Sequence, residues 1–315
     1  MIDARQPLIR LERLHRYFGD TKAVQDMSFE VHAGEVFGYI GPNGAGKTTS
    51  MRILATLDEP TYGDASVDGF SVVDDPDHVR RRLGFMPDYF GVYENVNVQE
   101  YLDFFARAYD LHGEERLDAV TRVMEFTQLD VLAEKPINGL SKGMKQRLCL
   151  GRTMIHDPAV LILDEPAAGL DPRARIELRE MIAQLARLGK AVLIISHILT
   201  ELAEIFDKVG IIEQGRLLAV GSVDEISGQV DAISKVRIRV LERRDELVRW
   251  LETHDDIVDL AVHNETLSLI HTGGREEQAE LLREIVVAGY RVVEFASQTK
   301  TLEDVFLHVT AGRVQ

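Results

Sequence analysis

The sequence has 315 residues, of which 45% are hydrophobic and 28% charged, a composition typical of folded globular proteins. Its 52 acidic residues outnumber the 36 basic ones, and because no basic stripe offsets the net charge of −16, nucleic acid is not expected as a partner. The single cysteine, the lack of a secretory signal and the lack of a run of the ~18–20 apolar residues that span a bilayer together favour a cytoplasmic protein. At roughly 150 residues per domain, two domains are expected.

The first part of the chain predicts strands followed by a helical insertion. Residues 8–14 and 23–31 alternate apolar and polar side chains, and residues 35–40 form an apolar run that ends in a glycine-rich turn. A helix is expected over 48–57, and two amphipathic helical patterns lie within 79–132. We expect this helical insertion to cover about residues 85–155.

The next part predicts helices that alternate with fully apolar strands. Helices are expected over 141–155 and 172–188, and buried strands over 159–163 and 191–196. This alternation predicts an α/β fold with a mostly parallel sheet covered on both faces.

A change to a polar composition with glycine and serine over residues 221–229 marks a domain boundary. Beyond it, strand and helix patterns follow in the order βαββαβ, which predicts a small α+β domain. We therefore expect one domain over 1–222 and an accessory domain over 230–315, whose histidines (His254, His263, His271 and His308) are expected mostly at the surface.

Residues 41–49 match the phosphate-binding pattern GxxxxGK[ST], between a predicted strand and a predicted helix. Glycines allow successive backbone N–H groups to converge on a polyphosphate, and the helix N-terminus adds partial positive charge. A plain glycine-rich turn is the alternative. The predicted phosphate-binding residues are Gly41, Pro42, Asn43, Gly44, Ala45, Gly46, Lys47, Thr48 and Thr49. Lys47 would reach the β- and γ-phosphates, and the Thr48 hydroxyl would hold Mg²⁺.

Two adjacent carboxylates, Asp164 and Glu165, follow a fully apolar strand at the end where open α/β sheets bind ligands. Asp164 would hold Mg²⁺ through water, and Glu165 would act as the general base of phosphoryl transfer. A solvated Asp-Glu-Pro turn is the alternative.

Between these two motifs, residues 140–147 (LSKGMKQR) resemble the LSGGQ signature of ATP-binding-cassette (ABC) transporters. Residues 167–171 are similar to that family's D-loop, His197 to its switch histidine, and Phe18 to the aromatic residue that stacks on adenine. The resemblance covers roughly residues 7–220. It implies a P-loop ATPase of the ABC type with a helical subdomain.

The resemblance further implies that two chains pair head to tail around two ATP molecules with Mg²⁺. Ser141 and Gly143 of one chain would face the γ-phosphate bound by the other, and Asp171 would connect the two sites. His197 would contact the γ-phosphate and the attacking water, whereas a lone histidine is more often a packing residue. The second subunit is either an identical copy or a paralogue.

Two departures from the family pattern stand out. Asp88 occupies the place of a glutamine that contributes an oxygen to Mg²⁺, and it would add a negative charge there. Lys142 replaces a signature glycine, and it either directs charge toward the partner's nucleotide or is a solvated lysine.

The residues after 230 and the segment around residues 91–96 resemble drug, lipid and polysaccharide exporters that carry the membrane domain on a separate polypeptide. The predicted function is therefore the ATPase subunit of an export transporter, bound through a permease to the cytoplasmic face of the membrane. The alternative is a soluble ABC-type ATPase with a mechanical or regulatory role. The cargo, and the role of the accessory domain, are left open.

Overall fold

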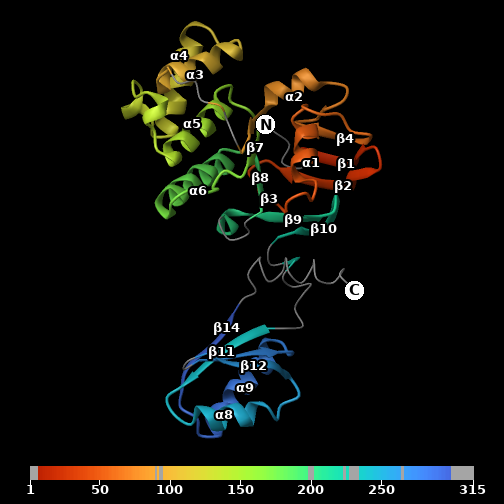
Figure 1. Cartoon of the computed structure of the whole chain (residues 1–315), viewed down its shortest axis with the longest axis vertical. Coiled ribbons are helices and arrows are strands. Elements are labelled where there is room, and N and C mark those ends of the chain that lie inside the picture. The colour runs from red at the N-terminus through yellow and green to blue at the C-terminus, as the bar shows by residue number, and fades with distance from the viewer. Residues whose placement is uncertain are drawn as a thin grey trace. The chain divides into compact units, whose positions relative to one another are not determined.

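The computed structural model describes residues 6–88, 91, 95–197, 202–222, 225–226, 234–263 and 266–298. The chain divides into two units, residues 1–223 and 224–315 (Figure 1). Each unit has its own hydrophobic core.

A six-stranded sheet with the order β10-β9-β3-β8-β7-β6 forms the centre of the first unit. β3, β6, β7, β8 and β9 run parallel, and only β10 is antiparallel to its neighbour. Every residue of β3, β7 and β8 is buried, as expected for strands that are covered on both faces. This confirms the predicted mostly parallel sheet. The strands are β3 (Val36–Ile40), β6 (Leu83–Met86), β7 (Val160–Asp164), β8 (Ala191–Ser196), β9 (Lys208–Glu213) and β10 (Arg216–Gly221).

A second, antiparallel sheet with the order β2-β1-β4-β5 packs its apolar side chains into the same core. Phe29 of this sheet stacks on Phe37 of β3, with ring centroids 4.9 Å apart. The strands are β1 (Pro7–Phe18), β2 (Thr21–His32), β4 (Tyr62–Val67) and β5 (Phe70–Ser71). Sequence analysis predicted the first two of these strands and made no prediction for β4 and β5.

The helical layer has a separate apolar core formed by α3, α4 and α5 and the loops between them. Residues 85 and 86, which sequence analysis placed at the start of this insertion, instead end β6 and pair with Ile162 and Leu163 of β7. The helices of the first unit are α1 (Lys47–Leu54), α2 (Pro76–Arg82), α3 (Val98–Ala108), α4 (Gly113–Phe126), α5 (Lys142–Met154) and α6 (Pro172–Arg187), with short 3₁₀ turns at Asp130–Leu132, Ile137–Gly139 and Ala203–Ile205.

The second unit has the predicted βαββαβ order, with an antiparallel sheet in the order β12-β13-β11-β14. Its elements are β11 (Ser234–Val240), α8 (Arg244–Leu251), β12 (Ile257–His263), β13 (Thr266–His271), α9 (Arg275–Val287) and β14 (Val292–Gln298). The expectation of surface histidines is wrong for His271, because it lies on the buried side of β13 with Leu267 and Leu269. His308 lies outside the described residues.

Candidate functional site

The phosphate-binding loop runs from the end of β3 to the first turn of α1. Gly46 has a φ of +100°, and a Cβ atom at this position would overlap the carbonyl oxygen of Ala23. A Cβ atom at Gly41 would likewise overlap the carbonyl oxygen of Ile212. Because β2 and β9 approach the loop this closely, glycine is required at both positions.

Lys47 begins α1, and its buried ammonium group turns back along the loop. Its Nζ donates hydrogen bonds to the carbonyl oxygens of Gly41 at 2.5 Å and Pro42 at 3.0 Å. Burial lowers the pKa of Lys47, and the charges of Glu165 and Asp164 act against that shift. The loop therefore holds a desolvated cation at the N-terminus of a helix, which is a favourable setting for an anion.

Asp164 is the last residue of β7, and only 8% of its surface is exposed. Burial, reinforced by the charges of Glu165 and Asp88, raises its pKa to about 6. Three carboxylates thus lie near one another, of which Asp164 is buried and Asp88 is exposed. The charge of Lys47 compensates them only in part.

Glu165 is bonded to the end of the neighbouring strand β8. Its Oε1 accepts a hydrogen bond from the backbone N–H of His197 at 2.9 Å and lies 2.6 Å from Nδ1 of the same histidine. The Glu165 backbone has a φ of +48°, and its N–H donates to the carbonyl oxygen of Ile195 at 3.0 Å. The pairing of β7 with β8 therefore sets the direction of this carboxylate.

These groups surround one cavity of about 380 Å³. It is lined by Ala23, Asn43, Gly44, Ala45, Gly46, Lys47, Thr48, Thr49, Asp88, Asp164, Glu165, Ile195 and His197. Gly41 and Pro42 contribute the carbonyl groups that hold Lys47. The structure thus brings most of the predicted nucleotide and metal residues together at the carboxyl ends of β3, β7 and β8.

The donor groups of the cavity suit a nucleotide with a magnesium ion. Thr48 supplies a hydroxyl, and Asp164 and Asp88 supply carboxylates whose mutual repulsion a cation would relieve. Within the described residues, no group of three or more His, Cys, Asp or Glu side chains is arranged as a metal site. Mg²⁺ in phosphoryl-transfer proteins takes one or two protein ligands, with phosphate and water supplying the others, so this arrangement fits.

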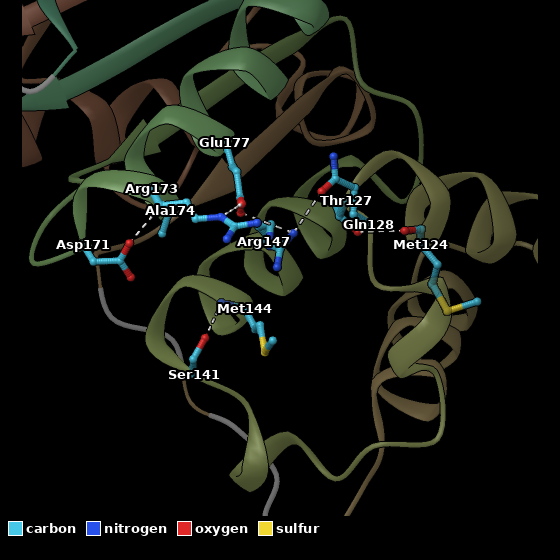
Figure 2. Close-up of polar contacts among 10 residues, drawn as sticks. All are labelled: Met124, Thr127, Gln128, Ser141, Met144, Arg147, Asp171, Arg173, Ala174 and Glu177. Carbon is cyan, nitrogen blue, oxygen red and sulfur yellow. Dashed lines mark hydrogen bonds and ion pairs between the residues drawn. The ribbon is translucent and has the colours of Figure 1, made fainter.

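The other predicted site residues lie outside the lining of this cavity. Phe18 ends β1 and is about half exposed. Ser141 is the N-cap of α5, where its hydroxyl accepts from the Met144 N–H at 3.3 Å. Asp171 is the N-cap of α6, where its carboxylate accepts from the Ala174 N–H at 2.9 Å (Figure 2).

The start of α5 packs against the chain that follows β7. A Cβ atom at Gly143 would lie 2.9 Å from the Ala174 Cβ, and the Lys142 ammonium lies against Gly169 of its own chain. Buried Gln146 donates from Nε2 to the carbonyl oxygen of Pro166 at 2.8 Å. The helix that carries the signature is therefore tied directly to the segment after Asp164 and Glu165.

Arg147, the residue after Gln146 on α5, connects three helical segments. It lies 3.7 Å from the Glu177 carboxylate of α6 and donates to the side-chain oxygen of Gln128, just after α4, at 3.3 Å (Figure 2). Arg173 also pairs with Glu177, at 3.1 Å. Neither Gln146 nor Arg147 had a role predicted from the sequence. Gln146 could have been singled out in the sequence, because it is a polar residue on an otherwise buried face of the helix.

Comparison with known proteins bears on both units. The ABC transporter family model matches residues 24–168, and the model for the C-terminal domain of DrrA1-3-like ATP-binding proteins matches residues 221–310. The Nod factor export ATP-binding protein I of Burkholderia lata is 34% identical over 98% of both chains. The bacitracin transport ATP-binding protein BcrA of Bacillus licheniformis is 33% identical over 97% of this chain and 98% of its own.

A solved structure of the ATP-binding subunit of an ABC transporter superposes with a TM-score of 0.64 at 30% identity, covering 71% of this chain and 93% of its own. Fold and site thus define a nucleotide-binding ATPase of the P-loop class. The chain belongs to the ABC transporter ATP-binding proteins, which are ATPases coupled to transport. This confirms the family and the enzyme class predicted from the sequence. In the part of the chain that the structure describes, no helix has the length and apolar character needed to cross a membrane.

Proposed function

We propose that this chain binds and hydrolyses Mg²⁺-ATP as the ATPase subunit of an export transporter whose membrane domain is a separate permease. The observation that carries the proposal is the Glu165–His197 pair, with Oε1 and Nδ1 2.6 Å apart, in one cavity with Lys47 and Asp164. Phosphoryl transfer to water requires a general base, a phosphate-binding cation and a metal-binding carboxylate in one site.

In this proposal each group has a separate role. Lys47 and the N–H groups of residues 43–49 bind the phosphates. Thr48 and Asp88, and Asp164 through water, would hold Mg²⁺, which would neutralise charge on the phosphates. Glu165 accepts the proton of the attacking water. His197, bonded to Glu165 through its backbone and side chain, orients that carboxylate and contacts the γ-phosphate.

The complete site needs two chains in this proposal. Ser141, Gly143 and Asp171 do not line the cavity of their own chain, and two of them cap the N-termini of α5 and α6. A helix N-terminus attracts anions. Each chain would therefore present its capped α5 to the ATP bound by the other, in a homodimer or with a paralogous subunit.

The export role and the membrane partner rest on the relatives. One relative is named for Nod factor export and another for bacitracin transport, and both are aligned over nearly their whole length. We propose that a permease holds this ATPase at the cytoplasmic face of the membrane. We further propose that residues 1–222 are the ATP-binding domain and residues 230–315 the accessory domain.

Replacing the proposed base tests the function directly. Glu165→Gln should lower the turnover of ATP by about 10²–10⁴-fold while ATP still binds, because loss of a general base affects the chemical step. Phosphate release and equilibrium ATP binding are the measurements. Wild-type activity should rise faster than linearly with protein concentration, and the variant should accumulate as an ATP-bound dimer in size-exclusion chromatography.

The exposed residue Glu180 on α6 provides a matched control, since Glu180→Gln makes the same chemical change at a residue that does not line the cavity and should leave turnover unchanged. Lys47→Ala should instead weaken ATP binding itself. Wild-type turnover in Glu165→Gln would refute the assignment of the base.

A further inference from the structure

The end of the β1–β2 hairpin lies at the rim of the nucleotide cavity. Phe18 pairs with Thr21 at the tip of the hairpin, and Tyr17 pairs with Lys22. The next residue of β2 is Ala23, which lines the cavity and approaches Gly46 of the phosphate-binding loop. A base attached to phosphates in that loop would therefore be within reach of the half-exposed Phe18 ring.

One face of the Phe18 ring is already covered from within the chain. The guanidinium carbon of Arg16 lies over the ring, 4.5 Å from its centroid. The two residues are two positions apart on β1, so their side chains project from the same side of the strand. At this distance the positive guanidinium group and the negative face of the aromatic ring attract each other electrostatically.

Arg16 is held in this position by Asp58. An ion pair joins Arg16 Nη2 to Asp58 Oδ1 at 2.7 Å, and only 24% and 21% of the two side chains are exposed. Among the residues that the structure describes, the Arg16 Nε atom is buried and has no hydrogen-bond partner. The guanidinium group is thus anchored at one end by a carboxylate, and its central carbon lies over the aromatic ring.

The backbone on both sides of Arg16 is anchored to the same loop. The Thr61 N–H donates to the His15 carbonyl oxygen at 2.7 Å, and the Thr61 hydroxyl accepts from the Tyr17 N–H at 2.9 Å. Asp58 and Thr61 follow α1, the helix that begins with Lys47. The segment after the phosphate-binding helix therefore also positions Arg16 beneath the ring.

We infer that Arg16 is a positioning residue for the adenine base of ATP. It occupies one face of Phe18, leaves the other face to the base, and restricts the ring to an orientation suited to stacking. The inference rests on the proposed role of Phe18 as the adenine platform. Two effects would favour binding of the base. The guanidinium cation on one face polarises the Phe18 ring and strengthens its stacking with a base on the other face. A ring that is already held in its bound orientation also loses less conformational entropy when the base binds.

The test compares a ligand that has a base with one that lacks it. Arg16→Met keeps the length of the side chain and removes the charge and the planar group. We expect the Kd for ATP to rise about three- to tenfold, whereas the Kd for inorganic tripolyphosphate stays within about twofold of wild type. Arg10→Met is the matched control, because Arg10 is also on β1 but pairs with Glu12 and Glu30; it should change neither constant.

A second variant keeps the cation and removes its anchor. Asp58→Asn should raise the Kd for ATP in the same direction as Arg16→Met, again without affecting tripolyphosphate, and it addresses the inference even where Arg16→Met lowers the Tm strongly. An unchanged Kd for ATP in both folded variants would overturn the inference. Equal weakening of ATP and tripolyphosphate would also overturn it, because the effect would then be on the phosphates or the fold.

Phe18→Ala separates this inference from the proposal on which it rests. If that variant binds ATP as wild type does, Phe18 is not the adenine platform and both fail. If Phe18→Ala weakens ATP binding and Arg16→Met does not, only the role of Arg16 fails. With both roles correct, the double variant Arg16→Met/Phe18→Ala should lose no more affinity for ATP than Phe18→Ala alone.

Discussion

At the scale of single residues, the carboxyl group of Asp164 lies in the cavity where its charged form is disfavoured. Burial raises the pKa of Asp164 from 3.8 to about 6, and Glu165 and Asp88 reinforce the shift. The folded protein therefore binds this proton more tightly than the unfolded chain does. The contribution of Asp164 to the free energy of unfolding should fall as the pH rises from about 4 to about 6, and this loss should persist at neutral pH.

This leads to a prediction for the protein without Mg²⁺ and nucleotide. Asp164→Asn should raise the free energy of unfolding at pH 7.5 by about 1–3 kcal/mol, because it removes a buried charge. The difference in the free energy of unfolding between the variant and the wild type should shrink as the pH falls through about 6. Urea unfolding at several pH values measures it, and a variant no more stable than wild type at pH 7.5 would contradict it.

Asp157→Asn is a control of opposite sign. A hydrogen bond from Lys190 at 2.7 Å lowers the pKa of Asp157. The charged form of this carboxylate therefore stabilises the folded state above its unfolded pKa, and this contribution is lost as the pH falls. Its replacement should lower stability at pH 7.5, and the loss should disappear in acid.

Asp88 lies in the same cavity and contributes to the raised pKa of Asp164. Asp88→Gln should keep ATPase activity and increase the Mg²⁺ concentration for half-maximal activity by about three- to tenfold, because a neutral oxygen attracts Mg²⁺ less than a carboxylate does. The measurement is a Mg²⁺ titration of phosphate release. An unchanged titration would remove Asp88 from the surroundings of the metal.

At the scale of elements, α5 links two sites that the proposal assigns to different ATP molecules. Its N-terminus carries Ser141, and one turn later Gln146 binds the Pro166 carbonyl next to Glu165. A displacement of α5 by the partner's nucleotide would therefore act directly on the chain that carries the proposed base. Arg147 extends this connection to Glu177 of α6.

Gln146→Leu tests the strength of this link. The change keeps similar volume but leaves the buried Pro166 carbonyl without its donor, so we expect the free energy of unfolding to fall by about 1–3 kcal/mol. Gln184→Leu, at an exposed position of α6, should change it by less than about 0.5 kcal/mol. Urea unfolding compares the two variants, and equal effects would show that the hydrogen bond of Gln146 has no special weight.

At the scale of the whole molecule, the proposed dimer must form between two chains that each carry a net charge of −16. Long-range repulsion between them is screened within ~10 Å at 0.1 M salt. The ATP-bound Glu165→Gln dimer should therefore associate about three- to thirtyfold more tightly at 150 mM than at 20 mM NaCl. Analytical ultracentrifugation measures this. Weaker association at higher salt would show that local attraction at the interface outweighs the net charge.

Parts of the site whose residues are close together in the sequence could be predicted more readily than parts whose residues are far apart. The phosphate-binding loop could be identified from one segment, because nine consecutive residues carry both its turn and its helix N-terminus. Glu165 was predicted as the general base from its place after an apolar strand, whereas His197 was assigned only through family resemblance. No local pattern joins the two residues, because 32 positions separate them and the β7–β8 pairing brings them together. The strands β4 and β5 had no prediction, because short antiparallel strands depend on their neighbours more than on their own pattern.

From the sequence alone we could predict the phosphate-binding motif, the apolar strands of the parallel sheet and the order of elements in the second unit, because these depend on neighbouring residues and on periodicity. Three other features became known from the folded chain: Gln146 binds Pro166, β6 extends the main sheet, and Arg16 lies between Asp58 and Phe18. These contacts join side chains and strands whose approach depends on packing, and no local pattern of the chain records such a distance.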